Sequence, residues 1–149
     1  MSDRSSLLTN IIYKNPGLHF SEMIRISGMK NGVLTHYLNK LESLGIINIK
    51  RERDKTRFFS PEISLEETKI IKFLRKETSR KILFLLIDSN MEFNEIVDKV
   101  KKSSPTISQN LTKLLKNDLI ILKIGSSKKK NFIKNNPLIQ KLIKKYQFQ

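Results

Sequence analysis

Apolar residues recur along most of this chain at spacings of three and four, which is the spacing of a buried helical face. The pattern predicts helices over residues 5–14, 21–27, 31–44, 64–76, 78–88, 94–100, 104–117 and 137–146. Short runs rich in β-branched and aromatic residues predict strands over residues 18–20, 46–50, 57–59, 119–124 and 131–134. We therefore expect a mainly α fold with small β-hairpins, which belongs to the α+β class.

Turn chemistry sets several of these boundaries. Residues 15–17, Asn-Pro-Gly, end the first helix because proline and glycine together prevent its continuation. Gly28 supplies the bend after the second helix, and Gly45 ends the third. Ser64 and Glu67 have the spacing of a capping box, so their side chains are expected to bond each other's backbone amides where the fourth helix begins.

The second half of the chain repeats the first. A shift of 73 residues without a gap aligns Phe20 with Phe93, Glu22 with Glu95, Leu38 with Leu111, Lys40 with Lys113, Leu41 with Leu114, Ile47 with Ile120, Lys50 with Lys123 and Lys55 with Lys128. We therefore expect two related domains, residues 1–62 and 78–149, joined by a linker helix over residues 63–77. The apolar surface of that helix is broad, and the sequence leaves open whether it joins the domains rigidly or forms part of a dimer seam.

Each domain has the element order of a winged helix-turn-helix: a helix, a turn, a second helix and a β-hairpin. The polar face of the second helix carries short or flexible side chains that suit base edges and phosphates in the major groove of DNA. In the first domain these candidates are Lys30, Asn31, Thr35, His36, Asn39 and Lys40. In the second domain they are Ser104, Thr106, Ser108, Gln109, Thr112 and Lys113.

Both hairpins are basic, which suits contact with a phosphate backbone. The cations of the first hairpin outnumber Glu52 and Asp54, and they are Lys50, Arg51, Arg53, Lys55 and Arg57. The expected tip of the second hairpin, residues 125–130, contains no acid and ends with Lys128, Lys129 and Lys130. A lysine run is usually only a solvated loop, but this one matches the position of the first basic tip, which favours phosphate contact.

The charge balance also points to an anionic partner. The chain holds 29 Lys and Arg against 14 acids, a net charge of +15, which favours nucleic acid or an acidic membrane surface. Residues 101–149 hold 12 lysines against Asp118 alone, a net charge of +11. The total net charge is weaker evidence for an anionic partner than its size suggests, because an AT-rich genome also encodes abundant lysine, isoleucine and asparagine.

Other functional classes find little support in the sequence. The chain has no cysteine and two histidines, His19 and His36, without metal-site spacing, so we expect no metal and no cofactor. It lacks a nucleophile-base pair and a phosphate-binding glycine loop, which argues against an enzyme. The longest apolar run, residues 82–87, is too short to span a bilayer, and no signal sequence begins the chain, so we expect a cytoplasmic protein without a membrane partner.

Residues 15–22, residues 30–42 and the Gly-Ile-Ile at 45–47 resemble archaeal transcriptional regulators with two winged helix-turn-helix domains. The second copy is similar to the single winged units of the ArsR and MarR groups. The resemblance implies recognition helices that carry Thr35, His36, Asn39 and Lys40 in one domain and Ser108, Gln109, Thr112 and Lys113 in the other. ArsR-type metal sensing does not carry over, because its cysteines are missing.

The leading hypothesis is a sequence-specific regulator of transcription that binds double-stranded promoter DNA with two recognition helices and two basic wings. The alternative is a tandem winged-helix subunit of the transcription or chromosome machinery that binds proteins. Such modules are usually less basic, so the charge of residues 101–149 favours nucleic acid. The sequence leaves open a homodimer, a contact with the transcription machinery, the operator and the direction of regulation.

Overall fold

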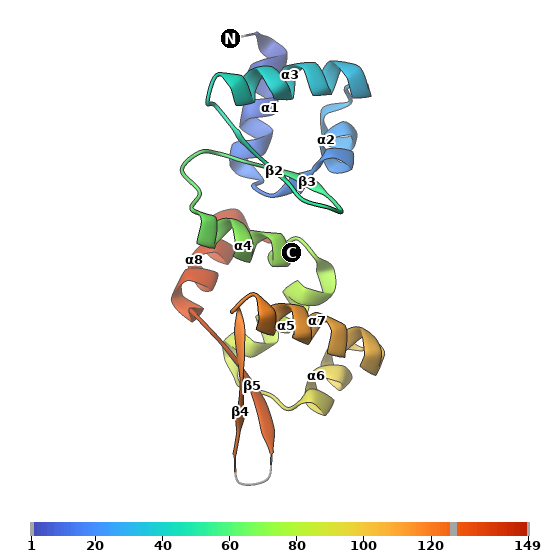
Figure 1. Cartoon of the computed structure of the whole chain (residues 1–149), viewed down its shortest axis with the longest axis vertical. Helices are drawn as coiled ribbons and strands as arrows, with labels where there is room; N and C mark the ends of the chain where they lie inside the picture. Colours follow the sequence, from blue (N-terminus) through green and yellow to red (C-terminus); the bar gives the residue numbers. More distant parts are fainter. Residues whose placement is uncertain (1, 126–127, 149) are drawn as a thin grey trace. The chain divides into compact units, whose positions relative to one another are not determined.

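The computed structural model describes residues 2–125 and 128–148, and Figure 1 shows their helices and strands. Those residues form eight α-helices and five β-strands, with every strand pair antiparallel. The expected α+β class with small hairpins is therefore confirmed. The chain divides into two compact units, residues 1–68 and 69–149, which we call unit 1 and unit 2. This division falls inside the helix that was expected to link two domains.

Unit 1 combines a helical layer with a small sheet. Its elements are α1 (Asp3–Lys14), β1 (Leu18–His19), α2 (Phe20–Ser27), α3 (Asn31–Ser43), β2 (Asn48–Arg51) and β3 (Thr56–Phe59). The strand order is β1-β3-β2, so β3 is the central strand, and Leu18 of β1 pairs with Phe58. Residues Leu18–His19 thus join the hairpin as a third strand.

The core of unit 1 determines which face of α3 meets solvent. Leu34, Leu38 and Leu41 fall on one side of α3 and are almost completely buried. They pack in one cluster with apolar residues of α1, α2, the sheet and the segment before β2, namely Leu8, Ile12, Leu18, Met23, Ile47 and Phe58. Burying each such side chain stabilises the fold by about 1.5 to 3 kcal/mol. The polar side of α3 is consequently held outward.

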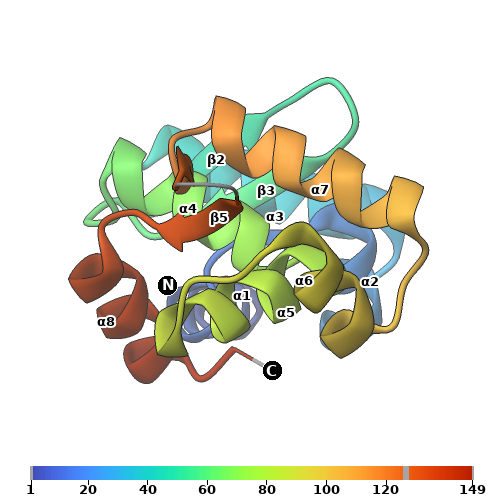
Figure 2. The same ribbon diagram turned by 90° about the horizontal axis from the view of Figure 1, so that it is seen from below.

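Unit 2 contains the other helices and a two-stranded sheet. Its elements are α5 (Glu77–Asp88), α6 (Phe93–Val100), α7 (Ser104–Lys116), β4 (Ile120–Ile124), β5 (Lys129–Ile133) and α8 (Asn136–Tyr146). Helices α5, α6 and α7 contact one another, as Figure 2 shows, and buried Ile107, Leu111 and Leu114 fix the inner face of α7. The β4–β5 ribbon extends away from these helices in Figure 1.

Left-handed residues end the helices at matching positions in the two units. Gly28 (φ 70°) follows α2, and Lys101 (φ 60°) follows α6 at the position 73 residues later. Gly45 (φ 73°) follows α3, and Asp118 (φ 63°) occupies the matching position after α7. Glycine enters this conformation easily, whereas a side chain with a Cβ is strained there. The element bounds thus keep the 73-residue offset, while a duplication of the sequence stays a prediction.

Helix α4 (Leu65–Leu74) spans the boundary between the units. The capping box at its start is confirmed, since the Ser64 amide donates to Glu67 Oε1 at 2.9 Å and the Glu67 amide donates to Ser64 Oγ at 3.1 Å. The helix ends two residues earlier than the sequence pattern indicated. Arg80 Nη1 donates to the Leu74 carbonyl at 3.0 Å, which satisfies a carbonyl that the end of the helix leaves without an intrahelical partner.

Candidate nucleic-acid interface

The outer face of α3 gathers the sequence-predicted residues of unit 1. All of them are exposed to solvent, and they are Lys30, Asn31, Thr35, His36, Asn39 and Lys40. Because the opposite side of α3 is held in the core, these side chains project on the solvent side of a single helix. The structure therefore places amide, hydroxyl, imidazole and ammonium groups along one surface.

The outer face of α7 carries the sequence-predicted residues of unit 2, and all but one of them are exposed to solvent. Ser104, Ser108, Gln109, Thr112 and Lys113 are exposed. Thr106 is half-buried, and its hydroxyl lies 2.8 Å from Ser103 Oγ, which also accepts a hydrogen bond from the Thr106 amide at 3.3 Å. Thr106 therefore takes part in the cap of α7, where a serine at the N-cap satisfies an amide at the start of the helix.

Asn110 is a positioning residue that the sequence pattern did not single out. Its Nδ2 donates to the Thr106 carbonyl at 2.8 Å within α7, and its Oδ1 accepts from Ser79 Oγ of α5 at 3.0 Å. Ser79 is buried. This bridge adds a directional contact to the apolar packing that orients α7, and only the folded arrangement of α5 and α7 reveals it.

Two arginines of the first hairpin are engaged within the protein. Arg51 makes two bonds to Glu42 of α3, with Nη1 at 2.8 Å from Oε2 and Nη2 at 2.9 Å from Oε1. These bonds lower the pKa of the Glu42 carboxyl. Arg57 was expected at a basic surface, and that expectation is wrong: the residue is 4% exposed, and its Nη1 donates to the Gly17 carbonyl at 2.6 Å. Burial lowers the Arg57 pKa.

The reason for the Arg57 error is the strand order. Arg57 lies in β3, which has neighbours on both sides, opposite His19 of β1 and Lys50 of β2. A side chain in a central strand is covered more readily than one at a hairpin tip. Lys50, Arg53 and Lys55 of the same hairpin are exposed.

The second hairpin carries an exposed row of lysines, Lys123, Lys128, Lys129 and Lys130. Lys129 and Lys130 belong to β5 rather than to the turn, and Ser126 and Ser127 of the expected tip lie outside the described residues. The Lys128 ammonium is 3.4 Å from Glu92 Oε1. The Lys123 ammonium lies 4.9 Å from the centre of the Phe132 ring.

Helices α3 and α7 each border a groove against the hairpin of their own unit. The groove of unit 1 has a volume of about 350 Å³, and the groove of unit 2 about 210 Å³. Seven lining positions of the two grooves are 73 residues apart: Phe20 and Phe93, Thr35 and Ser108, Leu38 and Leu111, Asn39 and Thr112, Ile49 and Leu122, Thr56 and Lys129, Phe58 and Asn131. The helix and the hairpin are thus juxtaposed in the same way within each unit.

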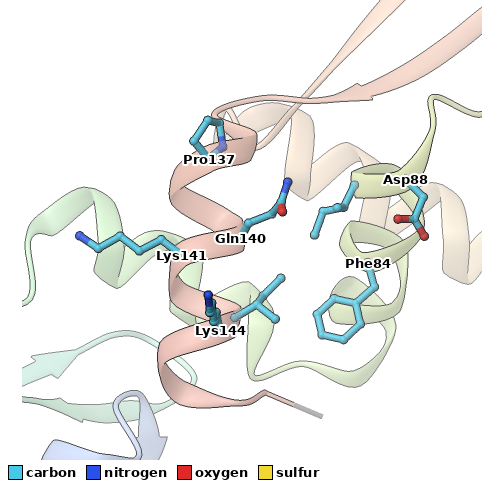
Figure 3. A pocket seen from close by; sticks show the side chains of 8 residues that line it. Phe84, Asp88, Pro137, Gln140, Lys141 and Lys144 are labelled. Atoms are coloured by element: carbon cyan, nitrogen blue, oxygen red, sulfur yellow. The ribbon is translucent and has the colours of Figure 1, made fainter.

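A third hollow, of about 540 Å³, lies between α5 and α8 in unit 2 (Figure 3). Half-buried Phe84, Ile87 and Ile143 provide its apolar floor. Figure 3 shows Gln140 directed towards α5 and Lys141 directed away from it. No predicted site residue lines this hollow. The sequence feature that corresponds to it is the apolar side of the helix predicted over residues 137–146, which is α8.

His19 is held within the fold of unit 1. Its Nε2 lies 3.1 Å from Glu22 Oε1, and the same carboxylate oxygen accepts from the His19 amide at 3.1 Å. Burial lowers the pKa of the imidazole. No group of three or more histidine and carboxylate side chains suited to a metal occurs among residues 2–125 and 128–148. The helices in that part of the chain include none long and apolar enough to cross a membrane.

Comparisons with known proteins agree with this geometry. Residues 76–121 match the model of the family described as bacterial regulatory protein, arsR family, which covers α5, α6 and α7. An uncharacterized HTH-type transcriptional regulator of Methanocaldococcus jannaschii, MJ1398, is 24% identical over 114 residues, 76% of this chain and 29% of that protein. This chain thus spans less than a third of that relative's length.

The fold is similar to that of one solved structure, and a second one aligns less well. HlyU from Vibrio cholerae has a TM-score of 0.50 at 19% identity, and the match covers 58% of this chain and 97% of HlyU. The transcriptional repressor BigR from Xylella fastidiosa has a TM-score of 0.48 at 12% identity, over 80% of this chain and 95% of BigR. The family model and the sequence relative that this chain matches are both described as regulators, and the family match falls in unit 2.

Proposed function

We propose that this protein is a sequence-specific regulator of transcription that binds double-stranded DNA through two winged helix-turn-helix units. In this proposal α3 and α7 read base edges in the major groove, and the basic hairpins contact phosphates. One observation supports it most: α7 exposes Ser108, Gln109, Thr112 and Lys113 beside a hairpin that exposes Lys129 and Lys130.

The chemistry of the two helix faces suits direct reading of bases. A major groove is about 12 Å wide and admits one α-helix. Asn39 and Gln109 carry carboxamides, which can pair with both the N6 and N7 edges of adenine, and Lys40 and Lys113 can donate to guanine or to phosphate. The hydroxyls of Thr35 and Ser108 can contact either kind of group. Because the core holds both helices in place, binding requires no ordering of the backbone that carries these side chains.

The oligomeric state determines the form of the proposed DNA site. One chain with two recognition helices predicts an extended or split site, and a homodimer predicts a palindromic or repeated site. Sedimentation of the protein alone and with a selected duplex separates these arrangements. A contact with the transcription machinery is a further proposal, to be tested by binding assays with purified polymerase and initiation factors.

Selection from a randomised duplex pool tests the proposal directly. The full chain is mixed with the pool, bound duplexes are amplified over several rounds, and their affinities are measured by fluorescence anisotropy at several salt concentrations. Enrichment of one motif, with affinity that falls steeply as salt rises, supports a sequence-specific regulator. Salt-sensitive binding without a motif contradicts base reading, and an absence of binding at low salt favours the protein-interaction alternative.

A further inference from the structure

The two units differ greatly in charge. Unit 1 holds 10 Lys and Arg against eight acids, a net charge of +2, whereas unit 2 holds 19 against six, a net charge of +13. Two surfaces that each neutralised the same number of phosphates would be expected to carry comparable positive charge. The similar grooves of the two units therefore stand in very different electrostatic settings.

The cations of the first hairpin are buried, paired with a carboxylate or accompanied by acids within unit 1. Arg57 is buried against the Gly17 carbonyl, and Arg51 is paired through two bonds with Glu42. The exposed cations that remain, Lys50, Arg53 and Lys55, share the hairpin with the acids Glu52 and Asp54. The net positive field of this hairpin towards a phosphate backbone is consequently small.

The second hairpin lacks those offsets. At the offset of 73 residues, Ile124 stands where the first hairpin has Arg51, and Leu115 stands where α3 has Glu42. The positions that match Glu52 and Asp54 are Gly125 and Ser127, so this hairpin carries no acid of its own. Four exposed lysines remain, and among the described contacts Glu92, the residue before α6, lies near one of them, Lys128.

We propose that the two units divide the work of DNA binding. Unit 2 supplies the phosphate contacts that anchor the protein, through the lysines of its hairpin. Unit 1 adds base reading from α3 with few phosphate contacts of its own. Arg51 is then a positioning residue, which holds β2 against α3 through Glu42. This inference rests on the proposed function, because it assigns roles within one DNA complex.

The division of work appears in the salt dependence of binding. Each phosphate contact contributes about 0.9 to the slope of log affinity against log salt concentration on B-DNA. Replacing three contacting lysines should flatten the slope by about 2 to 3. Replacing three cations that make few such contacts should flatten it by less than about 1. Slopes separate phosphate contacts from base contacts, which change affinity without changing the slope in this way.

Three full-length triple variants, each lacking three positive charges, make the test. The first changes the second hairpin, the second changes the first hairpin, and the third is a net-charge control on exposed positions of α8. They are K128Q/K129Q/K130Q, K50Q/R53Q/K55Q and K141Q/K144Q/K145Q. A fourth variant, Asn39→Ala, tests base reading by α3. Unchanged thermal melting of each variant checks that the fold is intact, and anisotropy on the selected duplex gives each slope.

We expect the second-hairpin variant to show a salt slope that is flatter by about 2 to 3 than that of the unmodified chain. The first-hairpin and α8 variants should keep nearly the slope of the unmodified chain. Asn39→Ala should change the enriched motif at constant slope. Three results would overturn the inference. The first-hairpin variant could flatten the slope as much as the second-hairpin variant, the α8 control could do the same, or Asn39→Ala could leave the enriched motif unchanged. In those cases DNA binding by the unmodified chain persists. Failure of the unmodified chain to bind any duplex would instead refute the proposed function.

Discussion

The turn between α6 and α7 gives a prediction whose size follows from backbone geometry. Lys101 ends α6 with φ 60° and ψ 44°, and its amide donates to the Val97 carbonyl at 3.0 Å. A residue with a Cβ is less stable in this conformation than glycine by about 1 to 2 kcal/mol. Glycine also loses more entropy on folding, which costs about 0.4 to 1 kcal/mol. Lys101→Gly should therefore exceed Lys101→Ala in stability by about 0.5 to 1 kcal/mol.

The alanine variant is the matched control, because both variants lose the Lys101 charge and differ only in the Cβ. Gly28 provides the reverse experiment in unit 1. A Cβ built there meets no heavy atom within 4 Å, so Gly28→Ala should cost about the same 0.5 to 1 kcal/mol through backbone strain alone. The stability that Lys101→Gly gains over Lys101→Ala in unit 2 should thus be close to the stability that Gly28→Ala loses in unit 1.

Scanning calorimetry of the full chain measures both effects, because two units can unfold in separate transitions. For a domain of this size, the expected difference corresponds to about 2 to 8 °C in melting temperature. Equal melting temperatures for Lys101→Gly and Lys101→Ala would show that the α6–α7 turn carries no left-handed strain.

Four further predictions concern single side chains. Arg57→Met should destabilise unit 1 by about 1 to 3 kcal/mol in calorimetry and leave the salt slope of DNA binding unchanged. A flatter slope with unchanged stability would instead show that Arg57 contacts phosphate. Leu114→Ala should lower the stability of unit 2 by about 2 to 5 kcal/mol because it leaves a cavity beneath α7. Gln109→Ala should lose about 1 to 3 kcal/mol of discrimination at one base pair in competition assays. The Glu42–Arg51 pair stabilises the folded state above the ordinary carboxyl pKa and loses that effect as pH falls through the lowered Glu42 pKa. Acid titration of the unmodified chain should therefore show a small loss of stability in this range, and Glu42→Gln should abolish that pH dependence.

Helix positions were predictable because they depend on local patterns. The apolar spacing of residues 31–44 and 104–117 gave α3 and α7 to within one residue at each end. The outward faces followed from the same spacing, so the exposed residues of both helices could be named in advance, apart from half-buried Thr106. The capping box at Ser64 was equally local and equally predictable.

Contacts that depend on the register of separate segments were not predictable. The burial of Arg57 depends on β1 joining the outer side of β3, and the composition of the hairpin carries no trace of this. The Arg51–Glu42 and Asn110–Ser79 pairs each join two elements whose approach the sequence does not encode locally. Cations that look equivalent along the hairpin therefore differ in role once the strands are paired.

The two units keep one backbone geometry with different residues. The backbone is left-handed at Gly28 after α2 and at Lys101 after α6. It is also left-handed at Gly45 after α3 and at Asp118 after α7. In unit 2 that geometry persists at a cost that glycine avoids in unit 1. Packing and turn geometry thus constrain where a recognition helix and its hairpin lie, whereas surface charge is free to diverge. A shared geometry with a net charge of +2 in one unit and +13 in the other is the pattern expected when both helices read bases and unit 2 supplies most of the phosphate contacts.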